Sequence, residues 1–450
     1  MNKIPEADQD YSLLFYSEIL LSSKGMKKYW INLLIVGMTL GTAWAIRGQF
    51  GHEQGAAWAG GIGALALVLV AGRKDWNARA LAISLASAIG WGAGGMISYG
   101  QIVGYGRSDD FLNASYGLLM LLIIGGLYGL LGGGLVGLSL SSTNQKRVAW
   151  GPLIAEMTAG GIIAYYFLIG QLELLMTPPR SEAWAVCFGA GIAMIWFMAR
   201  RQYAPALRVA LISALGAGFG FAFGNFLQIL GNVLEIQFNM WNVMEYAIGF
   251  FGGTSMAFGV FSTKWPEERE TAMIKPWEKR SAFFIVFVLI PVLVFEQSSS
   301  LINPLLNGFI QIQQEGNATL PGSLVALIIL IVMIWLGRNK VVNISSISGA
   351  RQNVRFLFIL YFAVYMIFSY IVSGAFTGIF MLNHHLYVIN LMVILFLVGK
   401  QFPVFPDNLH SGIQASDWFK LLLVLVLTIL LLSFISILIH DEIGGSNIRF

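Results

Sequence analysis

Long apolar stretches recur along most of this chain, and they restrict its possible folds more than any other feature. A helix of about 20 apolar residues crosses the hydrocarbon core of a bilayer, which is about 30 Å thick. Only 11% of the residues are charged, against about 25% in an average soluble domain. The sequence therefore predicts an all-α polytopic membrane protein of about 13 transmembrane helices. The predicted spans are residues 30–50, 55–72, 79–103, 115–140, 151–173, 182–199, 206–230, 242–262, 281–301, 321–337, 355–377, 384–400 and 418–440.

Basic residues are distributed unevenly among the loops between these spans. Twenty-three of the 27 Lys and Arg residues fall in the N-terminal segment or in loops after even-numbered spans. Cytoplasmic loops are enriched in Lys and Arg. We therefore predict a multi-pass inner-membrane protein with a cytoplasmic N-terminal segment, residues 1–29, and an extracytoplasmic C-terminus. The lipid bilayer is then the main partner, and no basic patch with interleaved aromatic residues predicts binding to nucleic acid.

Short sequence matches at a nearly constant spacing indicate an internal duplication. The matching segments are SAIGWGAGG (87–95) with SALGAGFGF (213–221), and QIVG (101–104) with QILG (228–231). The two spacings are 126 and 127 residues, and we predict two tandem repeats of four helices. Because four is an even number, the repeats cross the membrane in the same direction and are parallel. The predicted parts are repeat A at 30–145, repeat B at 151–265, and a C-terminal five-helix part at 281–440 that faces lipid or mediates oligomerisation.

Glycine is abundant inside the predicted spans, in strings such as GGLYGLLGGGLVG (125–137). A phosphate-binding glycine loop follows a strand and opens a helix, whereas these glycines lie within apolar runs. Small residues inside membrane helices let two backbones approach closely. The glycines therefore predict a tightly packed helix bundle.

The stretch AIRGQFGHEQGAAWAGG (45–61) places three ionisable residues, Arg47, His52 and Glu53, between two apolar runs. Charges this close to hydrocarbon are costly unless they are paired or face a cavity. Two interpretations remain: an Arg47–Glu53 ion pair that closes the turn, or a site that binds substrate. The corresponding part of repeat B, IGQL (169–172), keeps the Gly and Gln of RGQF but lacks the Arg. This asymmetry favours a specialised site in repeat A.

Further polar residues are predicted at the same extracytoplasmic end of the helices. The candidate catalytic residues, which would act as acid and base, are Glu53, His52, Asp109 and Asp110. The candidate substrate-binding residues are Arg47, Gln49, Tyr99, Gln101, Tyr105, Arg107, Asn113, Asn225, Gln228 and Glu235. Paired carboxylates about 5–9 Å apart can hydrolyse a glycosidic bond, but a solvated loop also explains Asp109 and Asp110.

Neither a metal nor a cofactor is expected. The HExxH zinc motif is not completed, because Ala56 follows HEQG. The single cysteine, Cys187, excludes a cysteine-based metal site and an intramolecular disulfide. His384 and His385 would join His52 in one site only if the fold brings them together.

Two classes of function fit this pattern. The first is a transporter of a small polar solute, carbohydrate-like or anionic, which Arg47 and Glu53 bind in an outward-facing site over repeat A. Glu156, inside the fifth span, is a candidate for proton coupling or for pairing with a basic loop. The alternative is an integral-membrane hydrolase or transferase that acts at the extracytoplasmic face on a glycan or lipid-linked sugar, with Glu53 and His52 as acid and base. A transporter needs a path on the cytoplasmic side, whereas an enzyme does not.

Overall fold

The structure is a computed structural model that describes residues 30–50, 52–176, 181–266, 275–298, 320–343, 349–372, 382–399, 415–441 and 443–450. Within these residues the chain is helical and contains no β-strand. Eleven helices are long and apolar enough to cross a membrane, or up to 12 if the bent pair α4 and α5 counts as one span. The prediction of an all-α polytopic membrane protein is therefore confirmed. The predicted segment 1–29 lies outside the described residues.

The helices follow the order of the predicted spans. The first group contains the Trp30–Arg47 helix, α2 (His52–Ala71), α3 (Lys74–Ala78), α4 (Ala80–Gly95), α5 (Gly100–Gly106) and α6 (Phe111–Ser141). The second contains α7 (Trp150–Ala164), its π-helical continuation η1 (Tyr165–Gln171), α8 (Glu182–Arg200), α9 (Ala204–Val233) and α10 (Met240–Phe261). The remaining helices are α11 (Pro276–Phe284), η2 (Ile285–Leu289), α12 (Ile290–Ser298), α14 (Leu320–Asn343), α15 (Ala350–Val372), α16 (Leu382–Gly399) and α17 (Ala415–Ile439).

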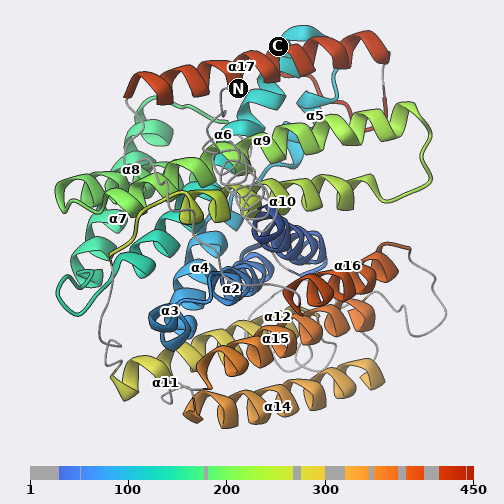
Figure 1. The fold of residues 1–450 in the computed structure, drawn as a ribbon. Coiled ribbons are helices and arrows are strands. Elements are labelled where there is room, and N and C mark those ends of the chain that lie inside the picture. Colours follow the sequence, from blue (N-terminus) through green and yellow to red (C-terminus); the bar gives the residue numbers. More distant parts are fainter. Residues whose placement is uncertain are drawn as a thin grey trace, which may run out of the picture.

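Glycines bring the central helices α6 and α9 together, and α10 packs closely on α9 (Figure 1). At Gly129 and Gly137 of α6, the α9 backbone at Ser213 and Ala206 occupies the space that a Cβ atom would need. The glycine strings therefore serve close helix packing, as the sequence predicts.

The two groups of helices are not packed alike. In the first group α2 packs closely on α4, and α4 on α6. In the second group α7 packs mainly on α8, and only 17% of the most apolar part of the Trp150–Gln171 span is buried. α7 thus stands apart from the central helices, whereas α8 also contacts α6 and α9. The tandem duplication stays a prediction.

The C-terminal helices flank the bundle on two sides (Figure 1). On one side, α12 and α15 pack on α2, where the Trp58 ring stacks on the rings of Tyr361 and Tyr365 at centroid distances of 5.3 and 4.7 Å. On the other side, α17 packs against α6 and α9. Oligomerisation through these helices stays a prediction.

Two helices of the first group end part of the way along α6. The Trp30–Arg47 helix has 18 residues and α4 has 16, whereas α6 has 31. At 1.5 Å per residue these helices are about 27, 24 and 46 Å long. α4 begins beside the end of α6, where Arg79 donates a hydrogen bond of 3.0 Å to the Ser139 carbonyl oxygen.

Both short helices end beside Tyr128, near the middle of α6. Gly94 at the end of α4 packs against the Tyr128 backbone, and the Trp44 ring lies 5.5 Å from the Tyr128 ring. The chain then bends by 66° between α4 and α5. The ends of these two helices therefore place Arg47 and the residues after Gly95 deep in the bundle.

The α6–α9 contact predicts different outcomes for two glycines one turn apart. In Gly129→Ala, the methyl group would overlap the Ser213 carbonyl oxygen, whereas in Gly126→Ala it would lie 3.6 Å from the Ala214 carbonyl oxygen. Both changes raise helix propensity by about 1 kcal/mol, but overpacking costs about 1–3 kcal/mol. We expect thermal unfolding in detergent to show a lower Tm for Gly129→Ala and an unchanged or higher Tm for Gly126→Ala. Equal melting temperatures would contradict this account of the contact.

Candidate functional site

A buried ion pair lies where the Trp30–Arg47 helix ends. Arg47 is 1% exposed, and its Nη2 donates hydrogen bonds of 3.0 and 2.8 Å to the two carboxylate oxygens of Glu245 on α10. The same nitrogen lies 2.9 Å from the hydroxyl oxygen of Tyr99, and the Tyr99 hydroxyl donates to Glu245. We call Arg47, Glu245 and Tyr99 the buried network.

The buried network joins three segments that are far apart in the sequence. Arg47 comes from the end of the first helix, Tyr99 from the break between α4 and α5, and Glu245 from α10. Trp44 lies against the cation, with its ring centroid 4.8 Å from the guanidinium carbon. Taking a charge out of water is costly unless opposite charge and hydrogen bonds replace its hydration. The network therefore fixes the relative positions of the three segments.

The partner of Arg47 differs from the one that the sequence suggests. Of the two interpretations of Arg47 and Glu53, the ion pair between them is wrong, because Arg47 pairs with Glu245, which lies 198 residues away in the chain. Glu245 is not among the binding residues predicted from the sequence. The signal that could have found it is a single acidic residue inside a predicted span, since such residues usually face a partner or a cavity.

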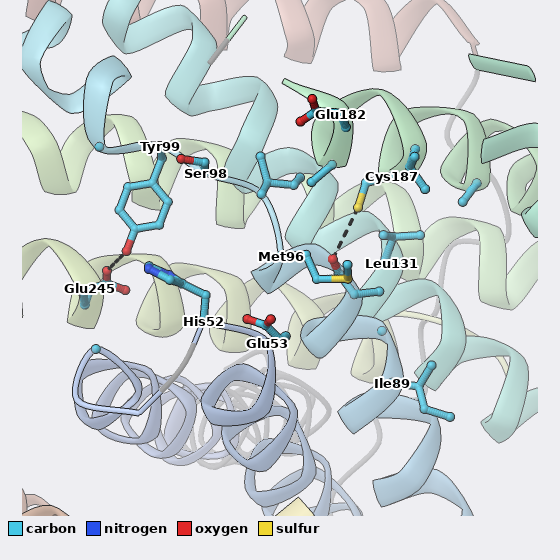
Figure 2. A pocket seen from close by; sticks show the side chains of 18 of the residues that line it. His52, Glu53, Ile89, Met96, Ser98, Tyr99, Leu131, Glu182, Cys187 and Glu245 are labelled. Carbon is cyan, nitrogen blue, oxygen red and sulfur yellow. Dashed lines mark hydrogen bonds between the residues drawn. The ribbon is translucent and has the colours of Figure 1, made fainter. Parts of the chain in front are cut away.

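Beside the buried network is a pocket of about 930 Å³, whose walls come from α2, α4, α6, α7, α8 and α10 (Figure 2). We call it the main pocket. Its apolar wall residues include Ile89, Leu131 and Val186. Its polar side chains are Gln49, His52, Glu53, Ser98, Tyr99, Glu182, Asn239, Trp241, Asn242 and Glu245. The pocket thus offers both polar groups and hydrocarbon surface to a ligand.

Two carboxylates of the main pocket differ from Glu245 because the fold leaves them without a counter-charge. Glu53 begins α2 and Glu182 begins α8, and in Figure 2 they lie in different parts of the pocket. Within the described residues, neither has an ion-pair partner within 4.0 Å. His52 lies beside the Tyr99–Glu245 hydrogen bond, with its Nδ1 atom 3.2 Å from Arg47 Nη1. Glu53 and Glu182 are therefore free to bind a ligand, and Arg47 is already neutralised.

Gln49 lies at the edge of the main pocket, and C-terminal helices hold it in place. Its amide oxygen accepts a hydrogen bond of 2.6 Å from Ser369 on α15, and its amide nitrogen lies 3.2 Å from Nε2 of His384 on α16. His385 contacts Tyr370 instead. His384 therefore orients the turn after Arg47. The described residues contain no group of three or more metal-ligating side chains.

Several candidate binding residues contact the C-terminal residues 443–450 rather than the main pocket. Gln101 accepts a hydrogen bond of 3.1 Å from Asn447, Arg107 donates one of 3.2 Å to the Gly444 carbonyl oxygen, and the Asn113 side chain accepts one of 2.7 Å from the Arg449 amide. Tyr105 is buried against Tyr116 with ring centroids 6.0 Å apart. Gln101, Arg107 and Asn113 thus contact the C-terminal residues, and Tyr105 packs on α6.

The other candidates also lie outside the main pocket. Asp110 caps α6 by accepting a hydrogen bond of 2.9 Å from the Asn113 amide. The hydrogen bonds that Asn113 donates lower the pKa of the Asp110 carboxyl group. Asp109 and Glu235 are exposed, and Asn225 bonds to Gln228 within α9 at 3.2 Å. The carboxylates that share the main pocket with Glu53 are Glu182 and Glu245, so Asp109 and Asp110 are not placed to act with it.

The buried network predicts a strong and non-additive effect on stability. Glu245→Gln leaves the Arg47 guanidinium buried without a counter-charge, and breaking such a pair costs about 3–5 kcal/mol. We expect the double variant Arg47→Met with Glu245→Gln to be more stable than Glu245→Gln alone, because the uncompensated charge is gone. Equilibrium unfolding in mixed micelles would measure both. If the two variants unfolded at the same denaturant concentration, the ion pair would not be the stabilising contact.

Comparison with protein-family models, curated proteins and solved structures finds no match for this chain. What the main pocket does is therefore inferred from its position, its shape and its charges.

Proposed function

We propose that the protein is a transporter of a small polar solute and that the solute binds in the main pocket. The observation that carries this proposal is the depth of the pocket in the helix bundle. The Trp30–Arg47 helix and α4 both end beside Tyr128, about halfway along α6. Transporter sites typically lie near the middle of the membrane, where interrupted helices leave backbone and polar side chains to bind a solute.

The interruptions are what this class of protein would require. The first helix ends at Arg47, and the α4–α5 pair bends by 66° at the break that contains Tyr99, which contacts Arg47. Helix ends leave backbone N–H and C=O groups without partners in the helix, and these groups supply directional contacts without adding net charge. The pocket therefore combines backbone polar groups, hydroxyl groups and amides in one place.

The charges of the main pocket favour a neutral, hydroxyl-rich solute or a cation. Glu245 neutralises Arg47, so Glu53 and Glu182 carry the remaining charge of the main pocket. Like charges that face each other across a site are unfavourable, so an anionic solute would be repelled. Of the two solute classes that the sequence suggests, the carbohydrate-like one suits this arrangement and the anionic one does not.

Glu156, the sequence-based candidate for proton coupling, lies in an ion pair with Arg200 at the end of α8. This contact corresponds to the alternative interpretation, in which Glu156 pairs with a basic residue at the predicted cytoplasmic end. Glu53 takes its place as the carboxylate to test, because it faces the pocket and has no counter-charge among the described residues.

A second candidate function is an integral-membrane enzyme, and one observation favours it. An apolar cavity of about 540 Å³ shares Ile89, Leu135, Met157 and other wall residues with the main pocket and extends to Trp150 at the beginning of α7. A hydrocarbon chain would fit there while its polar head group met His52 and Glu53. The enzyme would then act on a lipid-linked sugar, with these two residues as acid and base.

Reconstituted protein separates the two functions. Proteoliposomes with wild type, Glu53→Gln or the exposed control Glu235→Gln would be incubated with sugars, polyols, amines and glycolipids, and their contents identified by mass spectrometry. We expect a compound to enter unaltered with wild type and Glu235→Gln. Uptake should fall about tenfold or more with Glu53→Gln, since a hydrogen bond to a charged group contributes about 1.5–3 kcal/mol.

The stability of the variants and the chemistry of the products decide the interpretation. Glu53→Gln should unfold within about 1 kcal/mol of wild type, as exposed substitutions usually do. A compound that is chemically changed outside the vesicles, with wild type only, would replace the transporter by the enzyme. Identical behaviour of wild type and Glu53→Gln in both measurements would exclude the main pocket as the functional site.

A further inference from the structure

A second polar cavity of about 530 Å³ lies between α5, the α9–α10 connection and the C-terminal residues. It shares only Asn239 and Trp241 with the main pocket. We propose that it is a binding site for a small oxyanion of the phosphate or carboxylate type, held by Arg107 and Gln228. This site is separate from the proposed transport site and does not depend on it.

Arg107 is a buried cation without a counter-charge among the described residues. Only 7% of it is exposed, and its Nε atom has no hydrogen-bond partner. Its Nη1 atom donates to the Gly444 carbonyl oxygen at 3.2 Å, and its guanidinium carbon lies 5.1 Å from the Trp241 ring centroid. A carbonyl group and an aromatic ring compensate a full charge only in part. The guanidinium therefore retains an unmet demand for an anion.

Gln228, which also lines this cavity, carries a second unpartnered donor. It is fully buried on α9, and its side-chain oxygen already accepts a hydrogen bond of 3.2 Å from Asn225. Its amide nitrogen has no partner, although a buried polar group without a hydrogen bond costs about 1–3 kcal/mol. The described residues that line the cavity include no Asp or Glu. Two unmet donors, with no carboxylate among the described lining residues, favour a negatively charged ligand.

The C-terminal residues form one wall of this cavity and are shaped to fit Arg107. Gly445 has a φ of +79°, and a Cβ atom there would lie 2.7 Å from Arg107 Nη1. A side chain at this position would be strained by the backbone conformation and would require the Arg107 guanidinium to shift. The Asn447 amide donates a hydrogen bond of 3.0 Å to the Gly104 carbonyl oxygen, which holds this wall against α5. The anion would thus be enclosed between α9 and the end of the chain.

Binding of inorganic phosphate to the full-length protein in an uncharged detergent tests the proposal. Isothermal titration at constant ionic strength would compare the binding of phosphate with that of chloride. A second titration that compares phosphatidylglycerol with phosphatidylcholine would show whether a lipid head group is the source of the anion. The variants are Arg107→Gln, Arg107→Lys and Gln228→Leu. The control is Arg73→Gln, which removes an arginine that already pairs with Asp75 at 2.8 Å.

We expect phosphate or phosphatidylglycerol to bind to wild type, to Arg73→Gln and to Glu53→Gln. Arg107→Gln should weaken binding about tenfold or more, because a charge-assisted contact is lost, and Arg107→Lys should recover part of it. Gln228→Leu keeps the cation and should weaken binding to a smaller extent, which provides a second test if Arg107→Gln does not fold. Absence of binding to wild type, or equal binding to wild type and both Arg107→Gln and Gln228→Leu, would overturn the proposal. Since Glu53→Gln leaves this site intact, failure of the transport proposal would be seen separately.

Discussion

The ion pair between Arg47 and Glu245 is the contact on which the centre of the structure depends. The first helix ends at the cation, α10 provides the carboxylate, and the break between α4 and α5 provides the Tyr99 hydroxyl group. A guanidinium group away from water is tolerated only when opposite charge and hydrogen bonds replace its hydration. The buried charge and the helix ends therefore depend on each other, because the hydrogen bonds of Arg47 require all three segments to meet at this point.

Charged residues of this protein fall into two physical groups. Arg47 and Glu245 satisfy each other, so they hold the fold together and offer little to a ligand. Glu53 and Arg107 are left by the fold without an opposite charge among the described residues, and each faces a cavity. The two residues differ in burial: Glu53 is exposed, whereas Arg107 is buried. A charge without a partner costs little in water and much more when it is buried.

Sequence reasoning reaches the features that depend on neighbouring residues. The helical membrane class follows from the length of the apolar runs, and Arg47, His52 and Glu53 stand out because they interrupt such runs. Pairing across 198 residues is not visible in this way, so Glu245 was not chosen as the partner of Arg47. The sequence predicts Gln101, Arg107 and Asn113 at the same end of the helices as Arg47, and on that ground they are candidates for the same site. Their contacts with residues 443–450 depend on how the chain folds back.

The α7–α8 hairpin forms one wall of the main pocket, yet α7 packs mainly on α8 and not on the central helices. Its outer surface includes Ile154, Ile162 and Ile163, which are exposed and in a bilayer would meet acyl chains. The thickness and lateral pressure of the lipid would act directly on this wall, since helices adjust their tilt to the bilayer around them. The opposite wall, with Arg47 and Glu245, is shielded by neighbouring helices. The width of the pocket therefore depends partly on the surrounding lipid. The affinity for a given solute should then differ between protein in micelles and protein in bilayers.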